Sequence, residues 1–401
     1  MGASDGARQG DDGMGASAVD TVASGTSIYD SLGVRTFINA AGSYTRLGGS
    51  RMPRVVIDAM RDAALHFVEI DELQVRVGTR IAALTHNEAC YVSCGAAASL
   101  FVATAACMAG TNPALARQLP DPRGMPTRVV TYRAHRNPYD YAVRTLPVEL
   151  VEIGFPNEVI PAAEWELPHA LTEGTAAVLY TVGGWTSPGA LPLEQVIEMA
   201  HRAGVPVIVD AAAQLPPREN LWRFTGMGAD LVIFSGGKDL CGPQSSGLIL
   251  GRRDLIEACA LVGAPHHGIG RPLKVGKEEL VGLCAAVEWY MGRDEDARTR
   301  WAEQLVAQLA MRLSGPEIQV ERRFPNEAGQ LVARAHVRFT DPDGAARGAR
   351  AVALLQAGQP SIEVGASEVA GGFYVNPMTV EQDEVDVLLD RVCAVAREVC
   401  A

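Results

Sequence analysis

The stretch that decides the fold runs from Asp230 to Gly251 and reads DLVIFSGGKDLCGPQSSGLILG. The apolar run Leu231–Phe234 predicts a buried strand, and a second apolar run, Gly247–Leu250, predicts another. Between them, Lys238 follows two glycines in a turn that also contains Gly-Pro. A solubilising lysine sits on an exposed helix face or strand edge and needs no glycines beside it. The sequence therefore predicts that Lys238 is a reactive amine, desolvated on a rigid support, that attacks a carbonyl carbon.

Short apolar runs alternate with helical stretches around this segment. The runs are continuous rather than alternating, which is typical of strands covered by helices on both faces. Leu193–Ala203 is an intervening helical stretch that ends at Gly204. The pattern predicts an α/β fold with a mostly parallel sheet and one antiparallel strand after the Lys238 turn. The predicted strands are Val129–Tyr132, Leu150–Ile153, Ala177–Val182, Val205–Asp210, Leu231–Phe234 and Gly247–Leu250.

The C-terminal part of the chain predicts a smaller α+β domain. Its expected elements are helices at Gly276–Met291, Asp294–Leu313 and Thr379–Val399 and strands at Ile318–Phe324 and Leu331–Phe339. Residues 1–26 contain almost nothing to bury and predict a disordered leader. Ala89–Ala109 is apolar but rich in small residues, so we expect a buried helix there and not a membrane span. The expected divisions are a leader (1–26), an N-terminal arm (27–50), a large domain (51–275) and a small domain with its connecting helix (276–401).

Composition and charge exclude several classes of protein. The formal net charge of −12, with no stripe of Lys and Arg, argues against nucleic-acid binding. The eight cysteines lie singly in apolar stretches, as reduced thiols do in a cytoplasmic protein, and no signal peptide is seen. Cys90 and Cys94 could be half of a metal site, but no second pair completes it and core packing is favoured. We therefore expect no metal, no nucleic acid and no membrane partner.

A reactive lysine in a sheet of this kind points to pyridoxal 5'-phosphate (PLP) as the cofactor. PLP needs a lysine for its aldehyde, an acid against its ring nitrogen, a group over its ring and N–H groups for its phosphate. Asp210 ends a predicted strand, where loops at the carboxyl ends of strands build ligand sites. A buried carboxylate is costly unless it meets a cation, and the protonated ring nitrogen is one. The alternative for Asp210 is a helix N-cap.

The phosphate site is expected at Val92–Ser99, VSCGAAAS, where a glycine opens an alanine-rich helix. Phosphate oxygens bind the free N–H groups at such a helix start. The candidates are Gly95, Ala96 and Ala97, to which Ser235 can add a hydroxyl. Because Gly-Ala-Ala-Ala also occurs in plain helix packing, the pattern is informative only together with the other positions.

Two further polar residues have two interpretations each. His135, in YRAHRNPYDYAV, can stack on the cofactor ring and pass protons, or it can be a surface or capping histidine. Gln214, in VDAAAQLPP, can hydrogen-bond the phenolic oxygen of the cofactor, or it can cap a turn. The sequence alone does not choose between these.

Taken together, these stretches resemble the fold-type I PLP-dependent enzymes, in particular the branch of the selenocysteine synthases and D-glucosaminate-6-phosphate ammonia-lyases. SGGK followed by GPQSSG is the specific motif. The likeness extends from Ile28 to Tyr290 and is looser beyond. The other matching stretches are FINAAGSYTRLGGSRM, FVEIDELQVRVGTRIAALT, CGAAAS, AHRNPYDYAV, VDAAAQLPP and GIGRPLKVGKEELVGL.

The resemblance implies a large domain with a seven-stranded, mostly parallel sheet between helices, and a small C-terminal α+β domain. It implies that Lys238 forms the Schiff base, that Asp210 binds the ring nitrogen and that His135 stacks on the ring. Related enzymes often place an arginine in the small domain to bind the substrate carboxylate. This chain has Glu363 there, in PSIEVGAS, so the sequence does not indicate how the carboxylate is held.

The resemblance also implies substrate-facing residues and shared active sites in a homodimer or a higher homo-oligomer. Arg271 and Lys274 would face the cofactor or substrate across the dimer interface, or they form a solvated basic turn. The segment Asn39–Arg51 would line the substrate entrance, or it only ties subunits together. Its substrate candidates are Ser43, Tyr44 and Arg46.

We therefore expect a PLP-dependent lyase of the ammonia-lyase type that acts on a small hydroxylated amino acid. Lys238 would remove the Cα proton, the β-hydroxyl would leave, and the products would be ammonia and a 2-keto-3-deoxy acid. The alternatives are β-replacement on a small molecule, a transamination or cysteine desulfuration, and a PLP-binding regulator without enzymatic activity. Cys241 lies beside the lysine turn and is expected to be a structural thiol and not a persulfide carrier.

Overall fold

The computed structural model describes residues 27–156, 160–184 and 189–401. The chain divides into two compact units, Met1–Phe37 and Ile38–Ala401. In the first unit the described residues include one helical turn, α1 (Ile28–Ser31), whose N-cap Ser27 accepts a hydrogen bond from the Tyr29 N–H. The expected disordered leader, residues 1–26, lies outside the described residues.

A seven-stranded sheet forms the centre of the large part of the second unit. Its strands are β2 (Ala89–Ser93), β3 (Arg128–Tyr132), β4 (Glu149–Ile153), β5 (Thr175–Thr181), β6 (Val207–Asp210), β7 (Leu231–Ser235) and β8 (Gly247–Gly251). The order across the sheet is β2-β8-β7-β6-β5-β3-β4, and β8 runs antiparallel to both of its neighbours while the other pairs are parallel. The predicted sheet, with one antiparallel strand after the Lys238 turn, is confirmed.

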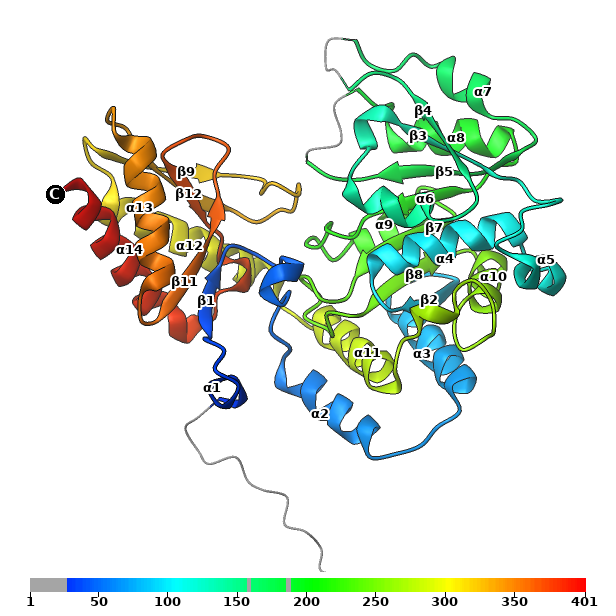
Figure 1. Cartoon of the computed structure of the whole chain (residues 1–401), viewed down its shortest axis with the longest axis horizontal. Coiled ribbons are helices and arrows are strands. Elements are labelled where there is room, and N and C mark those ends of the chain that lie inside the picture. The colour runs from blue at the N-terminus through cyan, green and yellow to red at the C-terminus, as the bar shows by residue number, and fades with distance from the viewer. Residues whose placement is uncertain (1–26, 157–159, 185–188) are drawn as a thin grey trace, which may run out of the picture. The chain divides into compact units, whose positions relative to one another are not determined.

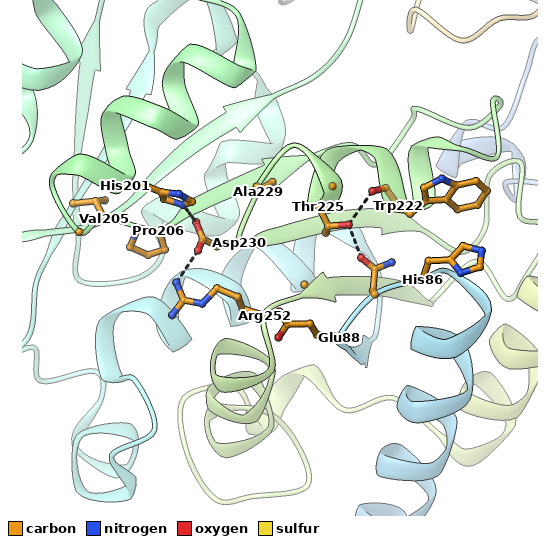
Figure 2. A pocket seen from close by; sticks show the side chains of 15 residues that line it. His86, Glu88, His201, Val205, Pro206, Trp222, Thr225, Ala229, Asp230 and Arg252 are labelled. Atoms are coloured by element: carbon orange, nitrogen blue, oxygen red, sulfur yellow. Dashed lines mark hydrogen bonds and ion pairs between the residues drawn. The ribbon is translucent and has the colours of Figure 1, made fainter.

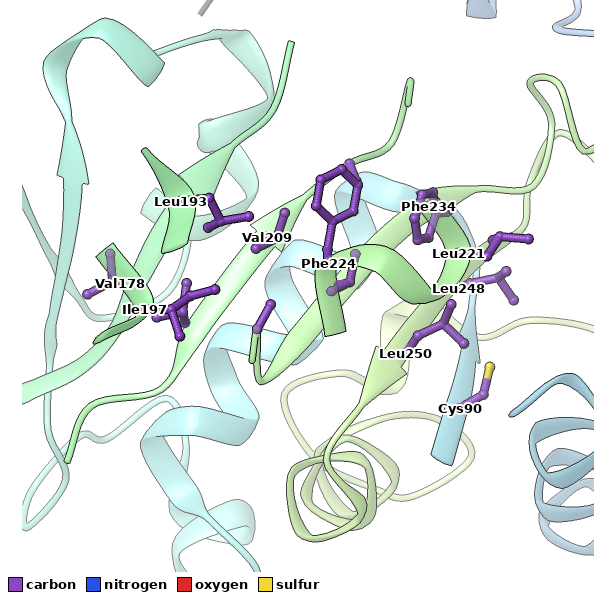
Figure 3. Close-up of a cluster of buried hydrophobic side chains, with 14 of the residues drawn as sticks. Cys90, Val178, Leu193, Ile197, Val209, Leu221, Phe224, Phe234, Leu248 and Leu250 are labelled. Carbon is purple, nitrogen blue, oxygen red and sulfur yellow. The ribbon is translucent and has the colours of Figure 1, made fainter. Parts of the chain in front are cut away.

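Helices cover both faces of this sheet (Figure 1). One face packs against α4 (Ala96–Ala109), α5 (Pro113–Gln118), α6 (Tyr141–Arg144) and α10 (Arg253–Val262). The other packs against α3 (Ile70–Leu84), α7 (Glu166–Ala170), α8 (Leu193–Arg202), α9 (Asn220–Gly226) and α11 (Lys277–Met291), and α2 (Arg54–Ala64) lies against α11. Figure 3 shows Val209 and Phe234 of the central strands beside Leu221 and Phe224 of α9. Because successive strand residues point to opposite faces, both faces require apolar side chains.

The expected single helix at Ala89–Ala109 is wrong in its first part. The structure divides this segment into the strand β2 and the helix α4. Gly95 lies between them with a φ of 127°, a backbone conformation that residues with a side chain rarely adopt, and the chain changes direction there. The residues of α4 are mostly buried, as expected. Within the described residues, no helix is both long enough and apolar enough to cross a membrane.

A five-stranded sheet forms the smaller part of the second unit, with strand order β1-β11-β12-β10-β9. The predicted strand from Leu331 begins instead at Arg334, and the predicted helix from Thr379 begins at Val385. The expected domain limits remain predictions, although β1 joins this small sheet and α11 shares the core of the large one. The elements are β1 (Phe37–Ala40), α12 (Glu295–Leu313), β9 (Ile318–Arg323), β10 (Arg334–Phe339), α13 (Gly344–Ala357), β11 (Ser361–Ala366), β12 (Gly372–Val375) and α14 (Val385–Cys400).

The two faces of the small sheet differ in polarity. Ala335, Val337 and Phe339 of β10 are buried in an apolar core with α12, α13 and α14. The residues between them on β10 belong to the other face, since side chains alternate along a strand. Arg334 and His336 therefore lie on a polar face, which Tyr374 of β12 shares because it pairs with His336.

Candidate active site

The ends of β3, β5, β6 and β7 gather most of the cofactor residues predicted from the sequence. Asp210 at the end of β6 pairs with Thr181 at the end of β5. Ser235 ends β7, three residues before Lys238, and His135 is the last residue of the 3-10 turn that follows β3. We call this side of the large sheet the carboxyl edge. Parallel strands build ligand sites at such an edge.

Lys238 and Asp210 are desolvated groups at the carboxyl edge that lie close enough to interact electrostatically. Burial lowers the pKa of the Lys238 amine, and Asp210 and Glu327 oppose that shift. Burial also raises the pKa of Asp210, opposed by a hydrogen bond from the Ala212 N–H at 3.1 Å and by Lys238. A buried amine of lowered pKa is suited to nucleophilic attack and to accepting a proton.

The lysine turn is packed so closely that it requires its glycines. A Cβ atom on Gly237 would lie 2.6 Å from the Cα of Gln244. The Ser50 hydroxyl donates hydrogen bonds to the carbonyls of Gly237 and Lys238, at 3.0 and 2.7 Å. A Cβ on Gly49 would lie 2.7 Å from the Gly237 carbonyl oxygen. The predicted arm segment Asn39–Arg51 therefore holds the lysine turn of its own chain.

His135 is buried, with 2% of its surface exposed. Its Nδ1 accepts a hydrogen bond from the Thr181 N–H at 3.3 Å, which leaves Nε2 as the protonated nitrogen of the neutral ring. That Nε2 atom is buried without a hydrogen-bond partner among the described residues. The ring lies edge-on to Tyr180, with centroids 4.4 Å apart. An orphaned donor at a carboxyl edge fits a bound ligand better than it fits a surface histidine.

Burial of His135 should make the stability of the protein depend on pH. Burial lowers the His135 pKa from 6.5 to about 4, so between these values the unfolded chain binds more protons than the folded one. This contribution is complete above pH 6.5 and is lost as the pH falls through 4, an expected loss of about 3 kcal/mol. Urea unfolding of the protein without added cofactor measures it. His135→Gln should flatten the dependence of the free energy of unfolding on pH. His169→Gln, which changes an exposed histidine, should leave that dependence as it is. The same pH dependence in the native protein and both variants would contradict the assignment.

The start of α4 forms a cradle beside the lysine turn. Gly95 is the N-cap, so the N–H groups of Ala96 and Ala97 have no partner within the helix. The hydroxyls of Ser93 and Ser99 both donate to the Gly95 carbonyl, at 3.0 and 3.2 Å, which fixes the turn. A Cβ on Gly247 of β8 would lie 2.8 Å from the Ala96 nitrogen. The chain thus keeps side chains out of a place that suits phosphate oxygens.

Gln214 takes part in a contact that the sequence did not predict. Its Nε2 donates to the Ala328 carbonyl at 2.8 Å, and the Gln330 amide donates to the Leu215 carbonyl. Asn326 accepts hydrogen bonds from the N–H groups of Ala328 and Gln330, each at 3.0 Å. These buried bonds fix the loop 326–330, between β9 and β10, onto the loop after β6. The predicted contact of Gln214 with the cofactor stays a prediction.

The fixed loop places Glu327 at the carboxyl edge, where sequence reasoning missed it. The Tyr44 hydroxyl donates to Glu327 Oε1 at 3.0 Å, and Arg334 Nη1 lies 3.0 Å from Oε2. Burial and Glu327 together raise the pKa of Tyr44 to about 12. The Arg334 guanidinium stacks 3.5 Å over the ring of Tyr374. Its Nε is buried without a hydrogen-bond partner in the described part of the chain.

The remaining predicted residues lie in more open positions. Ser43 is half-buried and Arg46 is exposed. Arg271 and Lys274 are exposed on the segment between α10 and α11, and their roles remain predictions. Glu363 occupies the place where related enzymes often have an arginine for the substrate carboxylate. It accepts a hydrogen bond from Gln356 of α13 at 3.1 Å. The one signal for Arg334 in the sequence was an arginine among apolar residues, in LVARAHV.

A cavity of about 660 Å³ lies at the opposite edge of the large sheet (Figure 2). In Figure 2, His201 and Arg252 approach the Asp230 carboxylate from two sides, at 2.8 and 2.7 Å. The carboxylate also accepts the Val207 N–H at 2.7 Å. These bonds satisfy Asp230, and the lining contains none of the predicted cofactor residues. No group of three or more His, Cys, Asp or Glu among the described residues is arranged to hold a metal ion.

Comparison with known proteins agrees with this arrangement. The sequence model described as aminotransferase class V matches residues 123–338. The chain is 36% identical to a 5'-C-glycyluridine monooxygenase-decarboxylase of Streptomyces sp, over 91% of this chain and 90% of that protein. It is 34% identical to the D-glucosaminate-6-phosphate ammonia lyase of Salmonella typhimurium, over 92% and 98%. A solved structure of D-glucosaminate-6-phosphate ammonia-lyase matches with a TM-score of 0.81 at 32% identity, covering 94% of this chain and 100% of that one. The predicted resemblance and fold are confirmed.

Proposed function

The chain belongs to the class V aminotransferase family of fold-type I PLP-dependent enzymes, and from this premise we propose that it is an ammonia-lyase that acts on a small 2-amino-3-hydroxy acid. The observation that carries the proposal is that a desolvated lysine, Lys238, and a buried carboxylate, Asp210, lie at the carboxyl edge close enough to interact electrostatically. The names of the two relatives support the substrate class. D-glucosaminate and 5'-C-glycyluridine, read as chemical names, each denote an α-amino acid with a hydroxyl on the neighbouring carbon.

Each residue of the site has a task in this proposal. PLP, when bound, supplies an electron sink for negative charge at the substrate Cα. Asp210 keeps a proton on the ring nitrogen, and the start of α4 at Gly95 binds the phosphate. Lys238 Nζ, whose neutral form burial favours, accepts the Cα proton and returns it to the departing hydroxyl, which leaves as water. His135 covers the ring, and hydrolysis then releases ammonia and a 2-keto-3-deoxy acid.

Arg334 is the residue that we assign to the substrate carboxylate. Its guanidinium is held by Glu327 and Tyr374, and its orphaned Nε leaves donors for a ligand. Arg334→Lys keeps the charge but loses the planar fork, so KM for amino acids should rise about 10- to 100-fold. Arg338→Lys, four residues further along β10, is the matched control and should leave KM unchanged. Steady-state kinetics measure both, and an unchanged KM in Arg334→Lys would reject the assignment.

The proposed reaction is tested by supplying the PLP-loaded protein with a panel of 2-amino-3-hydroxy acids and measuring ammonia and keto acid. Equal amounts of both products, formed without oxygen uptake, are expected. Ammonia release from 3-deoxy amino acids alone, or from no member of the panel, would contradict an elimination.

A second candidate is oxidative decarboxylation, which the name of the Streptomyces relative describes and its 36% identity favours. Oxygen uptake with release of carbon dioxide separates it from ammonia-lyase chemistry. β-Replacement and transamination remain alternatives, and added nucleophiles or keto acids test them. Cysteine desulfuration has less support, because burial raises the pKa of the Cys241 thiol to about 11 and keeps it protonated.

A homodimer or higher homo-oligomer in the cytoplasm is part of the proposal. Exposed apolar side chains on α2 and the segment after it supply a surface for a second copy. All eight cysteines are free, as in a reducing compartment. The mass of the protein in solution tests whether it forms a homodimer or a higher homo-oligomer. The exposed side chains are Val55, Ile57, Leu65, Phe67 and Val68.

A further inference from the structure

We propose that Glu327 recognises the 3-hydroxyl group of the substrate and thereby selects hydroxylated amino acids over their 3-deoxy analogues. This inference rests on the proposed function and concerns the same site. It assigns a specificity-determining role to a carboxylate that lies outside the motifs of the sequence.

The position of Glu327 is built into the fold. Its neighbours in the loop, Asn326, Ala328 and Gln330, are all at least nine-tenths buried. They bond to one another and, through Gln214 and Leu215, to the loop after β6, which begins at the cofactor carboxylate Asp210. A surface loop does not need this many buried hydrogen bonds, since water satisfies its polar groups. These hydrogen bonds, within the loop and to the loop after β6, therefore hold Glu327 in a fixed place.

The carboxylate of Glu327 has acceptor capacity to spare. A carboxylate offers about four lone-pair sites, and the Tyr44 hydroxyl occupies one of those on Oε1. Oε2 is ion-paired with Arg334 but has no hydrogen-bond partner among the described residues. The Arg334 guanidinium is ion-paired with this carboxylate, and the Lys238 amine lies close enough to interact with it electrostatically. A neutral donor such as a hydroxyl suits the free acceptor sites of Glu327, because a further cation would be repelled by Arg334 and an anion would be repelled by Glu327 itself.

Arg334 and Glu327 are close enough together to bind neighbouring substituents of one substrate. Arg334 and Glu327 lie side by side, 3.0 Å apart at their charged atoms. In a 2-amino-3-hydroxy acid, the carboxylate and the hydroxyl are on adjacent carbons, and the amine is on the carbon that carries the carboxylate. If the substrate carboxylate binds Arg334 and the substrate amine lies at the Lys238 end of the site, the substrate hydroxyl lies beside Glu327. Three recognising groups then face three different substituents.

The test compares two amino acids that differ by one hydroxyl. DL-Threonine and DL-2-aminobutyrate are titrated into the PLP-loaded protein, and the change in visible absorbance on amine exchange gives an apparent Kd for each. A hydrogen bond to a charged group should favour threonine about tenfold or more in the native protein. Glu327→Ala should bring the ratio to about one, because it weakens the binding of threonine more than that of 2-aminobutyrate. Glu327→Gln, which keeps an acceptor and the bond to Tyr44, should retain part of the preference.

Glu363→Gln is the matched control, since this carboxylate belongs to the same domain but bonds to α13. It should keep the native ratio. An unchanged ratio in both Glu327 variants, or an equal loss of affinity for both amino acids, would overturn the proposal. The ratio depends on amine binding and not on turnover. A native protein that prefers threonine but releases no ammonia would therefore contradict the lyase reaction while leaving the role of Glu327 intact.

Discussion

Replacing Lys238 with alanine should abolish the visible absorbance of the lysine-bound cofactor and lower kcat by about 10³-fold or more. The buried amine is assigned both the covalent attachment and the transfer of the Cα proton, and no other lysine adjoins Asp210 among the described residues. The sequence contains only three lysines, Lys238, Lys274 and Lys277. Absorbance spectra of the purified variant and initial rates of ammonia release measure the two effects.

Lys277→Ala is the control for this variant. Lys277 Nζ donates to the Ala63 carbonyl at 2.7 Å and pairs with Glu278, so its loss should affect packing between α11 and α2 and not the cofactor. Full absorbance and activity are expected. If Lys238→Ala remained coloured and active, a different lysine would carry the cofactor and the site would have to be redrawn.

Asp210→Asn should leave cofactor binding in place and lower kcat by about 10²- to 10³-fold. The amide has the shape of the carboxylate and can still accept the Ala212 N–H. It carries no charge, however, and cannot hold a proton on the ring nitrogen. Ammonia-release kinetics and the stoichiometry of bound cofactor report the two properties separately.

The same sheet offers a matched comparison for Asp210. Asp230 is also buried, at the opposite edge, where it accepts a hydrogen bond from the Val207 N–H. It is also paired with His201 and Arg252 (Figure 2). Asp230→Asn should lower the free energy of unfolding by about 1–3 kcal/mol, because it weakens a buried network, while kcat per folded molecule is kept. Near-native kcat in Asp210→Asn would remove the role assigned to that carboxylate.

The large sheet was predictable because its signals are local. Runs such as Leu231–Phe234 are apolar on both faces, and such runs have few other interpretations in a chain of this length. The prediction of a single helix at Ala89–Ala109 was wrong because the residues there are uniformly small and apolar. The change from strand to helix depends on the backbone conformation of Gly95. The short strands of the small sheet were missed in part, since β11 and β12 carry weaker patterns.

The site was predictable to the extent that its residues follow strands. Lys238, Asp210 and His135 each come just after an apolar run, and the ends of parallel strands meet in space. Glu327 and Arg334 gave no comparable signal. Glu327 stands in a polar segment, NEAGQ, whose position depends on hydrogen bonds to Gln214 and Leu215, more than a hundred residues away along the chain. Contacts of this range are fixed by tertiary packing and not by local pattern.

The most direct measurement is borohydride reduction of the purified coloured protein, followed by tryptic digestion and mass spectrometry. Reduction makes the cofactor linkage permanent, and trypsin does not cleave at a modified lysine. One peptide, spanning residues 224–252 and carrying the added mass on Lys238, is the predicted result. Added mass on Lys274 or Lys277, or on no peptide from a fully loaded sample, would contradict the account.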